Sequence, residues 1–294
     1  MVLIAILFAL GAERLFPTLY TLRRFDWLGG LSGWLRPRLG ALGKGTSGVV
    51  LIVGPLVLLT GLVWFLLLQI SWLLGFAFSV AVLLLCLGPR YLDDQVDLYI
   101  QARESGDAEA AHQAATDLLH AQVSGPSFQL TRAVTESILV QANERLFAVL
   151  FWFAVLPPFG AALYRLSLAL RQATTKSQEK SEFSQATVTL QAILDWVPAR
   201  LVALGYATTG SFIDALSHWR SSKANWTGKW DVANTGTLVS SGLGALRLHE
   251  EATPAPEDIQ AEIHEIKSAQ ALVWRTLVMW IVIIALMVLV GWTY

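Results

Sequence analysis

The sequence is poor in charge and in cysteine. Only 15% of its 294 residues are charged, whereas 54% are hydrophobic. Because soluble domains have about a quarter of their residues charged, this composition predicts a membrane protein. The net charge of -1 gives no global positive field that would attract nucleic acid, so we expect no nucleic-acid partner. The single cysteine, Cys86, can form neither an internal disulfide nor a thiolate metal cluster, and we expect it to be a small buried apolar residue.

Several catalytic motifs are also absent. The chain has no Walker P-loop, no GxGxxG and no HExxH sequence, and its histidines do not cluster with cysteine at metal-ligand spacing. Asp93, Asp94 and Asp97 have a helical spacing that would suit a divalent ion, but a solvated acidic helix face is the favoured interpretation. The sequence therefore predicts no metal site and no cofactor.

Long apolar runs are what the chain has instead. Residues 48–87 are nearly uncharged and twice as long as the roughly 20 residues that one span needs, which predicts a helical hairpin of 48–68 and 72–88. Residues 271–291 predict a further span. The run 1–16 is interpreted as a retained first membrane helix, with a re-entrant or surface helix as the alternative, since its basic residue follows the apolar core.

The direction of these spans follows from the basic residues of the first loop. Segment 14–45 holds one acidic residue, Asp26, against six basic ones: Arg14, Arg23, Arg24, Arg36, Arg38 and Lys44. Short loops rich in lysine and arginine stay in the cytoplasm. We therefore expect this loop and the chain after Arg90 in the cytoplasm, and the N-terminus and the turn at Gln69 outside.

Residues 146–170 form another apolar run, but Pro157-Pro158 lies in its middle. Proline lacks an amide donor and clashes with the preceding turn, so the pair predicts two short helices, 146–156 and 159–171. We interpret the segment as a re-entrant element that enters the membrane and returns. A kinked full span is the alternative, and it would put the flanking polar regions on opposite sides.

The polar regions predict further helices. In 90–145 we expect a break at Gly106, an N-cap at Asp107 and a third helix over 127–145. The C-terminal helix should begin near Glu257 and continue into the last span.

Between these helices the sequence predicts interruptions. Segments 171–186 and 221–235 are predicted loops, and Pro198, Gly205 and Gly210 should interrupt an amphipathic stretch over 187–220.

These elements define an all-α integral membrane protein with about four transmembrane helices, a broken re-entrant helix and a helical cytoplasmic domain. We predict three regions. The first is an N-terminal membrane region, 1–89, with helix 1–16, basic loop 17–46 and hairpin 47–88. A helical cytoplasmic region, 90–270, includes the re-entrant segment, and a C-terminal transmembrane helix covers 271–294.

One constellation of polar residues has the chemistry of a binding site. Glu136 and Glu144 can share a helix face, while Arg165 and Arg200 stand in apolar surroundings, where a guanidinium normally pairs with a carboxylate or phosphate. Internal ion pairs that hold the broken helix are the alternative interpretation. The candidate ligand-binding residues are Glu136, Gln141, Glu144, Tyr164, Arg165, Arg200 and Asn234, and no catalytic residue is assigned.

Several of these residues belong to an ordered series of short motifs. In chain order they are Arg90-Tyr91-Leu92, Gly106-Asp107, Glu136-Ser137, Leu150-Phe151-Trp152, Gly160-Ala161 with Tyr164-Arg165, Pro198-Ala199-Arg200-Leu201, Asn234 with Gly236, and Gly244-Ala245-Leu246. In this order they resemble the CbiB/CobD cobalamin-biosynthesis membrane proteins and their relatives, the AmpE proteins. The resemblance covers about 90–250.

The resemblance implies a site and also a departure from it. CbiB-type enzymes join an amino-alcohol phosphate to a corrinoid carboxylate using ATP. Their asparagine and aspartate positions after Glu-Ser fall here on Gln141 and Glu144. The asparagine and the acidic residue that follow their tyrosine–arginine fall on Leu168 and Arg171. Replacement of an acidic residue by arginine reverses the local charge. The sequence around Leu150-Phe151-Trp152 is also more similar to that of the AmpE proteins.

From this resemblance we expect an AmpE-like regulator of the bacterial inner membrane, associated with β-lactamase induction and cell-wall recycling. It would bind a small ligand or a membrane-protein partner without catalysis. The alternative is an active CbiB-like, ATP-dependent amide ligase of the adenosylcobinamide-phosphate synthase type, which would need ATP and Mg²⁺. A purely structural partner of another membrane protein is a third possibility. The lipid bilayer is the expected partner in each case, and the oligomeric state stays open.

Overall fold

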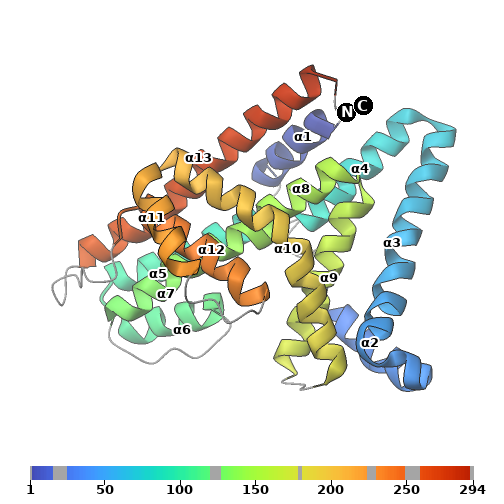
Figure 1. Cartoon of the computed structure of the whole chain (residues 1–294), viewed down its shortest axis with the longest axis horizontal. Coiled ribbons are helices and arrows are strands. Elements are labelled where there is room, and N and C mark those ends of the chain that lie inside the picture. Colours follow the sequence, from blue (N-terminus) through green and yellow to red (C-terminus); the bar gives the residue numbers. More distant parts are fainter. Residues whose placement is uncertain are drawn as a thin grey trace. The chain divides into compact units, whose positions relative to one another are not determined.

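The computed structural model describes residues 2–15, 25–119, 127–177, 181–223, 230–248 and 259–291. In these ranges the regular elements are all helices and no strand occurs, so the predicted all-α class is confirmed (Figure 1). Four helical stretches are long and apolar enough to cross a membrane: Gly45–Ile70, Phe128–Val155, Glu182–Thr209 and Ile259–Leu289. Val2–Glu13 and Trp72–Cys86 are shorter apolar helices.

The chain divides into two compact units. The first comprises Met1–Gly88, Glu144–Pro198 and Ile284–Tyr294, and the second comprises Pro89–Asn143 and Ala199–Ile283. The predicted division separates membrane regions from a cytoplasmic region, whereas these units are defined by their internal contacts. The predicted division therefore stays a prediction.

The first unit contains the following elements: α1 (Val2–Leu15), α2 (Asp26–Leu39), the 3-10 turn η2 (Gly40–Gly43), α3 (Gly45–Ile70), α4 (Trp72–Cys86), most of the π-helical turn η3 (Asn143–Phe147), α8 (Ala148–Val155), α9 (Phe159–Lys176) and the larger part of α10 (Glu182–Thr209). The second unit contains α5 (Pro89–Glu104), α6 (Ala108–Leu119), α7 (Ser127–Ala142), the end of α10, α11 (Phe212–Lys223), α12 (Trp230–Ala245) and most of α13 (Ile259–Leu289).

The predicted hairpin is present as α3 and α4, which meet at a turn on Ser71 (Figure 1). The Ser71 hydroxyl caps α4 by accepting from the backbone N–H of Leu73 at 3.2 Å. A Cβ on Gly75 would clash with the side chain of Leu68, so glycine lets the two helices approach closely at the turn.

The diproline break is also present. Helix α8 ends at Val155 and α9 begins at Phe159, directly after Pro158. Since α7, η3 and α8 continue into one another, the apolar stretch before the break runs over Phe128–Val155. Whether the segment re-enters or spans stays a prediction.

The core of the first unit lies where α2, α3, α9 and α10 meet. Its buried residues are Leu28, Val49, Ile52, Val53, Leu166, Ala169, Leu170, Phe183 and Ala186. Gly29 of α2 faces α9, and a Cβ there would lie 3.2 Å from the Ala173 Cβ. This contact fixes α2 beside the C-terminal half of α9.

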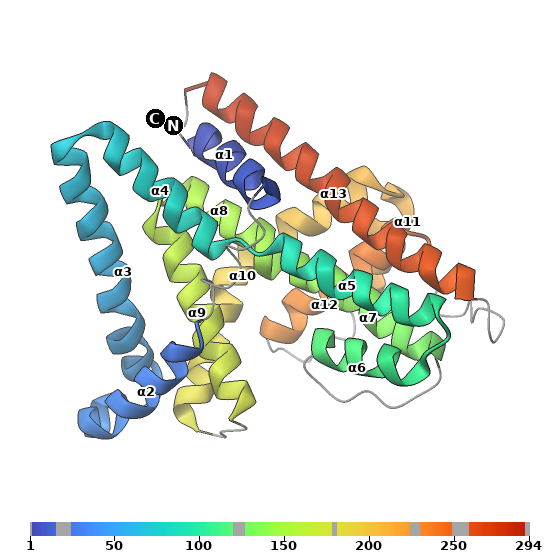
Figure 2. The ribbon, with the colours of Figure 1, turned by 180° about the vertical axis from the view of Figure 1, so that it is seen from behind.

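The second unit is built on α7, which packs against α5, α6 and α12 (Figure 2). The predicted N-cap is confirmed, because the Asp107 carboxylate accepts from the Ala110 N–H at 3.0 Å. Gly242 of α12 lies so close to Leu139 of α7 that a Cβ on it would clash. Small residues therefore set the distance between these helices.

The predicted interruptions at Pro198 and Gly205 are wrong, because α10 continues through both. Proline at 198 removes the amide that would bond the Leu194 carbonyl, but the indole Nε1 of Trp152 donates to that carbonyl at 3.1 Å. Gly205 gives room to α13, since a Cβ there would lie 2.7 Å from Thr276 Cγ2.

Three predicted loops are shorter than expected. Segment 14–45 contains α2, which is helical because Leu28 joins the core. Segment 171–186 continues α9 to Lys176 and contains the start of α10, and segment 221–235 contains the start of α12. Polar composition indicated loops there, but the core contact of Leu28 holds α2, and the buried contact between Thr174 and Thr187 joins the ends of α9 and α10.

Candidate functional site

A strip of polar side chains lies between α9 and α10 in the first unit. Residues 164, 167, 171 and 174 follow one face of α9, and residues 187, 191 and 195 follow one face of α10, at the i, i+3, i+4 spacing of a helix. The opposite face of α9, with Leu166, Ala169 and Leu170, enters the apolar core. We call this set, with Glu144 of η3, the polar strip: Glu144, Tyr164, Ser167, Arg171, Thr174, Thr187, Gln191 and Asp195.

Asp195 is the centre of the polar strip. Its Oδ1 accepts from the hydroxyl of Tyr164 at 2.6 Å, and its Oδ2 accepts from Nε2 of Gln191 at 3.0 Å. Tyr164 and Gln191 are fully buried and Asp195 is 7% exposed. A carboxyl group in such a place must be hydrogen-bonded, so these two donors hold both of its oxygens in fixed positions.

The charged end of the strip is an ion pair between Glu144 and Arg171. Glu144 Oε1 lies 3.2 Å from Arg171 Nη1, and both side chains are partly exposed. Glu144 stands in the π-helical turn η3, and such turns occur frequently at functional sites because they re-aim one side chain. The charges of both residues also act on Asp195.

The other end of the strip joins two hydroxyls. Thr174 and Thr187 lie 3.2 Å apart, and Thr187 donates to the Ser184 carbonyl at 2.7 Å. The Ser167 Oγ and the Gln191 Oε1 are buried and have no hydrogen-bond partner among the described residues. A water or a polar group of a ligand would satisfy both atoms.

Three of the predicted site residues belong to this unit. Glu144 and Tyr164 lie on the polar strip. Arg165 stacks instead on the ring of Phe25, with its guanidinium carbon 5.4 Å from the ring centroid.

The other four predicted site residues belong to the second unit. Arg200 Nη1 donates to the Asn234 Oδ1 at 3.1 Å, so these two predicted residues do meet. Glu136 forms an ion pair with Arg132 at 3.4 Å. Gln141 donates to the Leu118 carbonyl at 2.8 Å, which ties α7 to α6. That all seven residues form one ligand site stays a prediction.

The second unit also holds a buried network that the sequence did not indicate. Glu262 accepts from Arg103 Nε at 3.1 Å and from the Thr131 hydroxyl at 3.0 Å, and Tyr99 lies 3.1 Å from Thr131. Burial raises the pKa of Tyr99, so its hydroxyl stays protonated and can hydrogen-bond to Thr131. This network joins α5, α7 and α13.

The sequence did not indicate Asp195 because its partner Tyr164 comes from another helix, and Gln191 is defined only through its hydrogen bond to Asp195. One signal was present in the sequence: Asp195 is the only acidic residue in the otherwise apolar run 192–199. Such a residue in a candidate span is expensive to bury and is a functional-site hypothesis by default.

Both carboxylates of the strip are engaged by other side chains. Glu144 is paired with Arg171, and the two oxygens of Asp195 accept from Tyr164 and Gln191, so the strip alone forms no oxygen-rich cage for a divalent ion. Among the described residues no group of three acidic, histidine or cysteine side chains is placed to hold a metal, so Asp93, Asp94 and Asp97 form no such group.

Comparison with known proteins gives the family. The model of the family described as "CobD/Cbib protein" matches residues 6–271, so this chain belongs to that family of helical membrane proteins. It is 31% identical to the cobalamin biosynthesis protein CobD of Stutzerimonas stutzeri over 270 residues, which are 87% of this chain and 86% of the relative. It is 31% identical to the CobD of Chromobacterium violaceum over 180 residues, 59% of this chain and 55% of that protein. No solved structure matches the chain.

This family membership overturns the expected function. The predicted AmpE-like regulation of β-lactamase induction is wrong as the leading interpretation, since the relatives are named for cobalamin biosynthesis. The departures of the sequence from the CbiB pattern are what favoured AmpE. Three of the departing positions, Glu144, Leu168 and Arg171, lie on or beside the strip, and two of them pair with each other.

Proposed function

We propose that this protein acts in cobalamin biosynthesis as an amide-bond-forming ligase of the CbiB type. It would join the carboxylate of a corrinoid to the amine of an amino-alcohol phosphate, with ATP as the energy source. The observation that carries the proposal is the match over 266 residues, from 6 to 271, together with a relative of nearly equal extent that is named for this pathway.

The polar strip supplies groups that suit such substrates. Corrinoid carboxylate, amino-alcohol phosphate and ATP are all anionic, and a guanidinium donates two parallel hydrogen bonds to a carboxylate or a phosphate. Arg171 is the cation of the strip, and its side chain is 33% exposed. We propose that Arg171 exchanges Glu144 for an anionic group of a substrate.

Tyr164 and Asp195 would position this exchange. Their 2.6 Å hydrogen bond locks α9 against α10 and fixes the helix that presents Arg171. Tyr164 is fully buried and Asp195 is almost so, and we therefore assign them a positioning role and no proton transfer.

We further propose that the protein lies in the bacterial inner membrane. The basic segment 14–45 would face the cytoplasm and the turn at Ser71 the outside. This orientation would give the end of α9, with Arg171, access to cytoplasmic ATP.

Complementation tests the proposed function. We expect the gene to restore cobalamin-dependent growth to a bacterial strain that lacks its own CbiB-type enzyme. Arg171→Gln should abolish the rescue, whereas Arg220→Gln, which removes an exposed arginine on α11, should not. Absence of rescue by a wild-type protein that is present at normal level in the membrane would contradict the proposal.

A direct assay complements the genetic one. Purified protein with ATP, a corrinoid carboxylate and an amino-alcohol phosphate should form the amide, which mass spectrometry detects. Formation of the product without ATP would show that the reaction class is wrong.

A further inference from the structure

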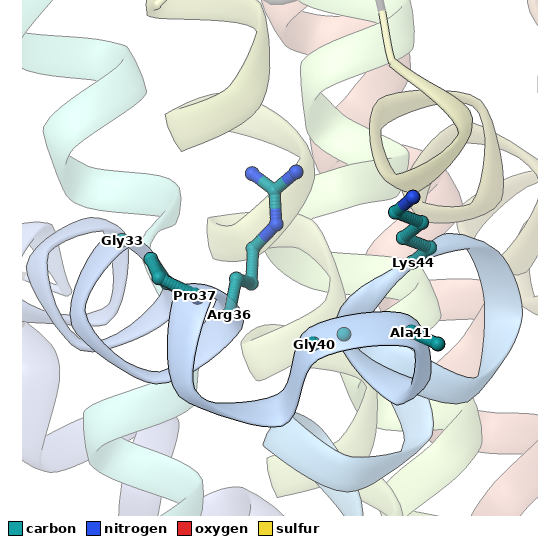
Figure 3. A pocket seen from close by; sticks show the side chains of 7 residues that line it. Gly33, Arg36, Pro37, Gly40, Ala41 and Lys44 are labelled. Atoms are coloured by element: carbon teal, nitrogen blue, oxygen red, sulfur yellow. The ribbon is translucent and has the colours of Figure 1, made fainter.

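A pocket with two cationic side chains lies where α2 turns into α3. It has a volume of about 620 Å³ and is lined by Gly33, Arg36, Pro37, Gly40, Ala41, Gly43 and Lys44. Figure 3 shows the side chains of Arg36 and Lys44 on the same side of this turn. Among the described residues that line it, two are cationic and none is acidic, which suits an anionic ligand.

The backbone of the turn places Arg36 and Lys44 at the same pocket. Gly40 has φ +54°, a left-handed conformation that favours glycine, and it reverses the chain after α2. Gly43 then packs against the backbone of Arg36, where a Cβ would lie 2.6 Å from the Arg36 carbonyl oxygen. Arg36 is held in place because its guanidinium stacks on Phe183, 4.2 Å from the ring centroid.

The position of the pocket along α3 indicates its depth in a membrane. Lys44 is the residue before Gly45, at which the candidate span Gly45–Ile70 begins. A helix of 26 residues is about 39 Å long and exceeds the hydrocarbon core of about 30 Å, so its first turn lies at the level of the lipid headgroups.

The exposed side chains of the same corner agree with this depth. Trp27 and Trp34, two turns apart on α2, are 50% and 57% exposed, and Leu42 is 61% exposed. Tryptophan is enriched at the membrane–water interface, where its ring lies between headgroups and acyl chains. Arg38 lies over the Trp34 ring at 3.4 Å, and it adds a cation at the same level.

From these observations we infer that the α2–η2 pocket binds the phosphate of an anionic phospholipid headgroup through Lys44 and Arg36. The ligand class is a phosphate diester with net negative charge, such as phosphatidylglycerol. This inference goes beyond the proposed ligase function and does not depend on it.

Native mass spectrometry of the full-length, delipidated protein tests the inference. Phosphatidylglycerol should bind about fivefold more tightly than phosphatidylcholine with the same acyl chains, because choline cancels the charge of the phosphate. Lys44→Gln should remove this preference and Lys44→Arg should keep it. Lys267→Gln, which removes an exposed lysine of the second unit, should also keep it.

Three outcomes would overturn the inference. Equal binding of the two lipids, or equal effects of Lys44→Gln and Lys267→Gln, would show that the pocket selects no headgroup. Complete competition by millimolar glycerol phosphate or inorganic phosphate would show that a soluble phosphate, rather than a lipid, is the ligand.

Discussion

Glu144 Oε1 and Arg171 Nη1 lie 3.2 Å apart and join two positions that the resemblance to the CbiB pattern singles out. In that resemblance both positions fall on acidic residues. Two carboxylates so close would repel each other unless a cation lay between them. In this chain Arg171 supplies that positive charge from its own side chain, so the departure that indicated a loss of function is an ion pair inside the candidate site.

The ion pair should be measurable as a coupling energy. We expect Glu144→Gln and Arg171→Gln each to lower the free energy of unfolding, and the double variant to lower it by less than their sum. Contacting residues of this kind couple by about 0.5 to 3 kcal/mol, and the partial exposure of both side chains places the value towards the lower end. Thermal unfolding in detergent micelles gives the four values, and strict additivity would contradict the pairing.

The hydrogen bond from Tyr164 to Asp195 should be worth more than an ordinary one. Tyr164→Phe leaves a buried carboxyl oxygen without its 2.6 Å donor, which should cost about 1.5 to 3 kcal/mol if the carboxyl is ionised.

Tyr206→Phe is the matched control for that substitution. Tyr206 is also fully buried, but its hydroxyl donates at 3.0 Å to the neutral Leu139 carbonyl, and its loss should cost about 1 kcal/mol. Equal losses of unfolding free energy in the two variants would remove the special role of Asp195.

The apolar helices and the turns between them could be predicted from the sequence. The turn at Ser71, the break at Pro157-Pro158 and the cap at Asp107 each depend on residues adjacent in the chain. Contacts between distant residues were not readable. Helix α10 continues through Pro198 because Trp152 donates a hydrogen bond to the Leu194 carbonyl. No residue near Pro198 in the sequence predicts that donor.

The candidate site divides in the same way. Tyr164 stood out because it belongs to a family motif, and Glu144 because it follows one. The role of Asp195 depends on the hydrogen bond that it accepts from Tyr164, which lies 31 residues earlier on another helix. In the sequence, Arg171 is only an arginine at an acidic position of the pattern. Its ion pair with Glu144 becomes evident only from the arrangement of the helices.

The indole of Trp152 should matter only while proline occupies position 198. Trp152→Phe removes the donor to the Leu194 carbonyl and should cost about 1 to 3 kcal/mol beyond the loss of ring volume. In a Pro198→Ala background the helix regains an amide that can bond the same carbonyl, so Trp152→Phe should cost less there. Unfolding of the four proteins measures the difference, and equal costs in both backgrounds would refute this compensation.

Gly205 should tolerate no side chain unless α13 gives room. The Cβ of Gly205→Ala would lie 2.7 Å from Thr276 Cγ2, and overpacking of this kind costs about 1 to 3 kcal/mol. Thr276→Ser removes that methyl group and keeps the hydroxyl that lies 2.9 Å from Thr209. The double variant should therefore recover most of the lost melting temperature, and no recovery would place the strain elsewhere.

The end of α9 should face the same side of the membrane as α2, opposite the turn at Ser71. Gly29 and Ala173 are in close contact, and α3 runs from the α2 end to Ser71 over its full length. In a Cys86→Ala background, a membrane-impermeant thiol reagent should label Ser71→Cys in intact cells, but not Lys176→Cys. Both should react after permeabilisation. Labelling of Lys176→Cys alone would reverse the orientation proposed from the basic residues, and labelling of both would contradict the placement of α9 beside α2.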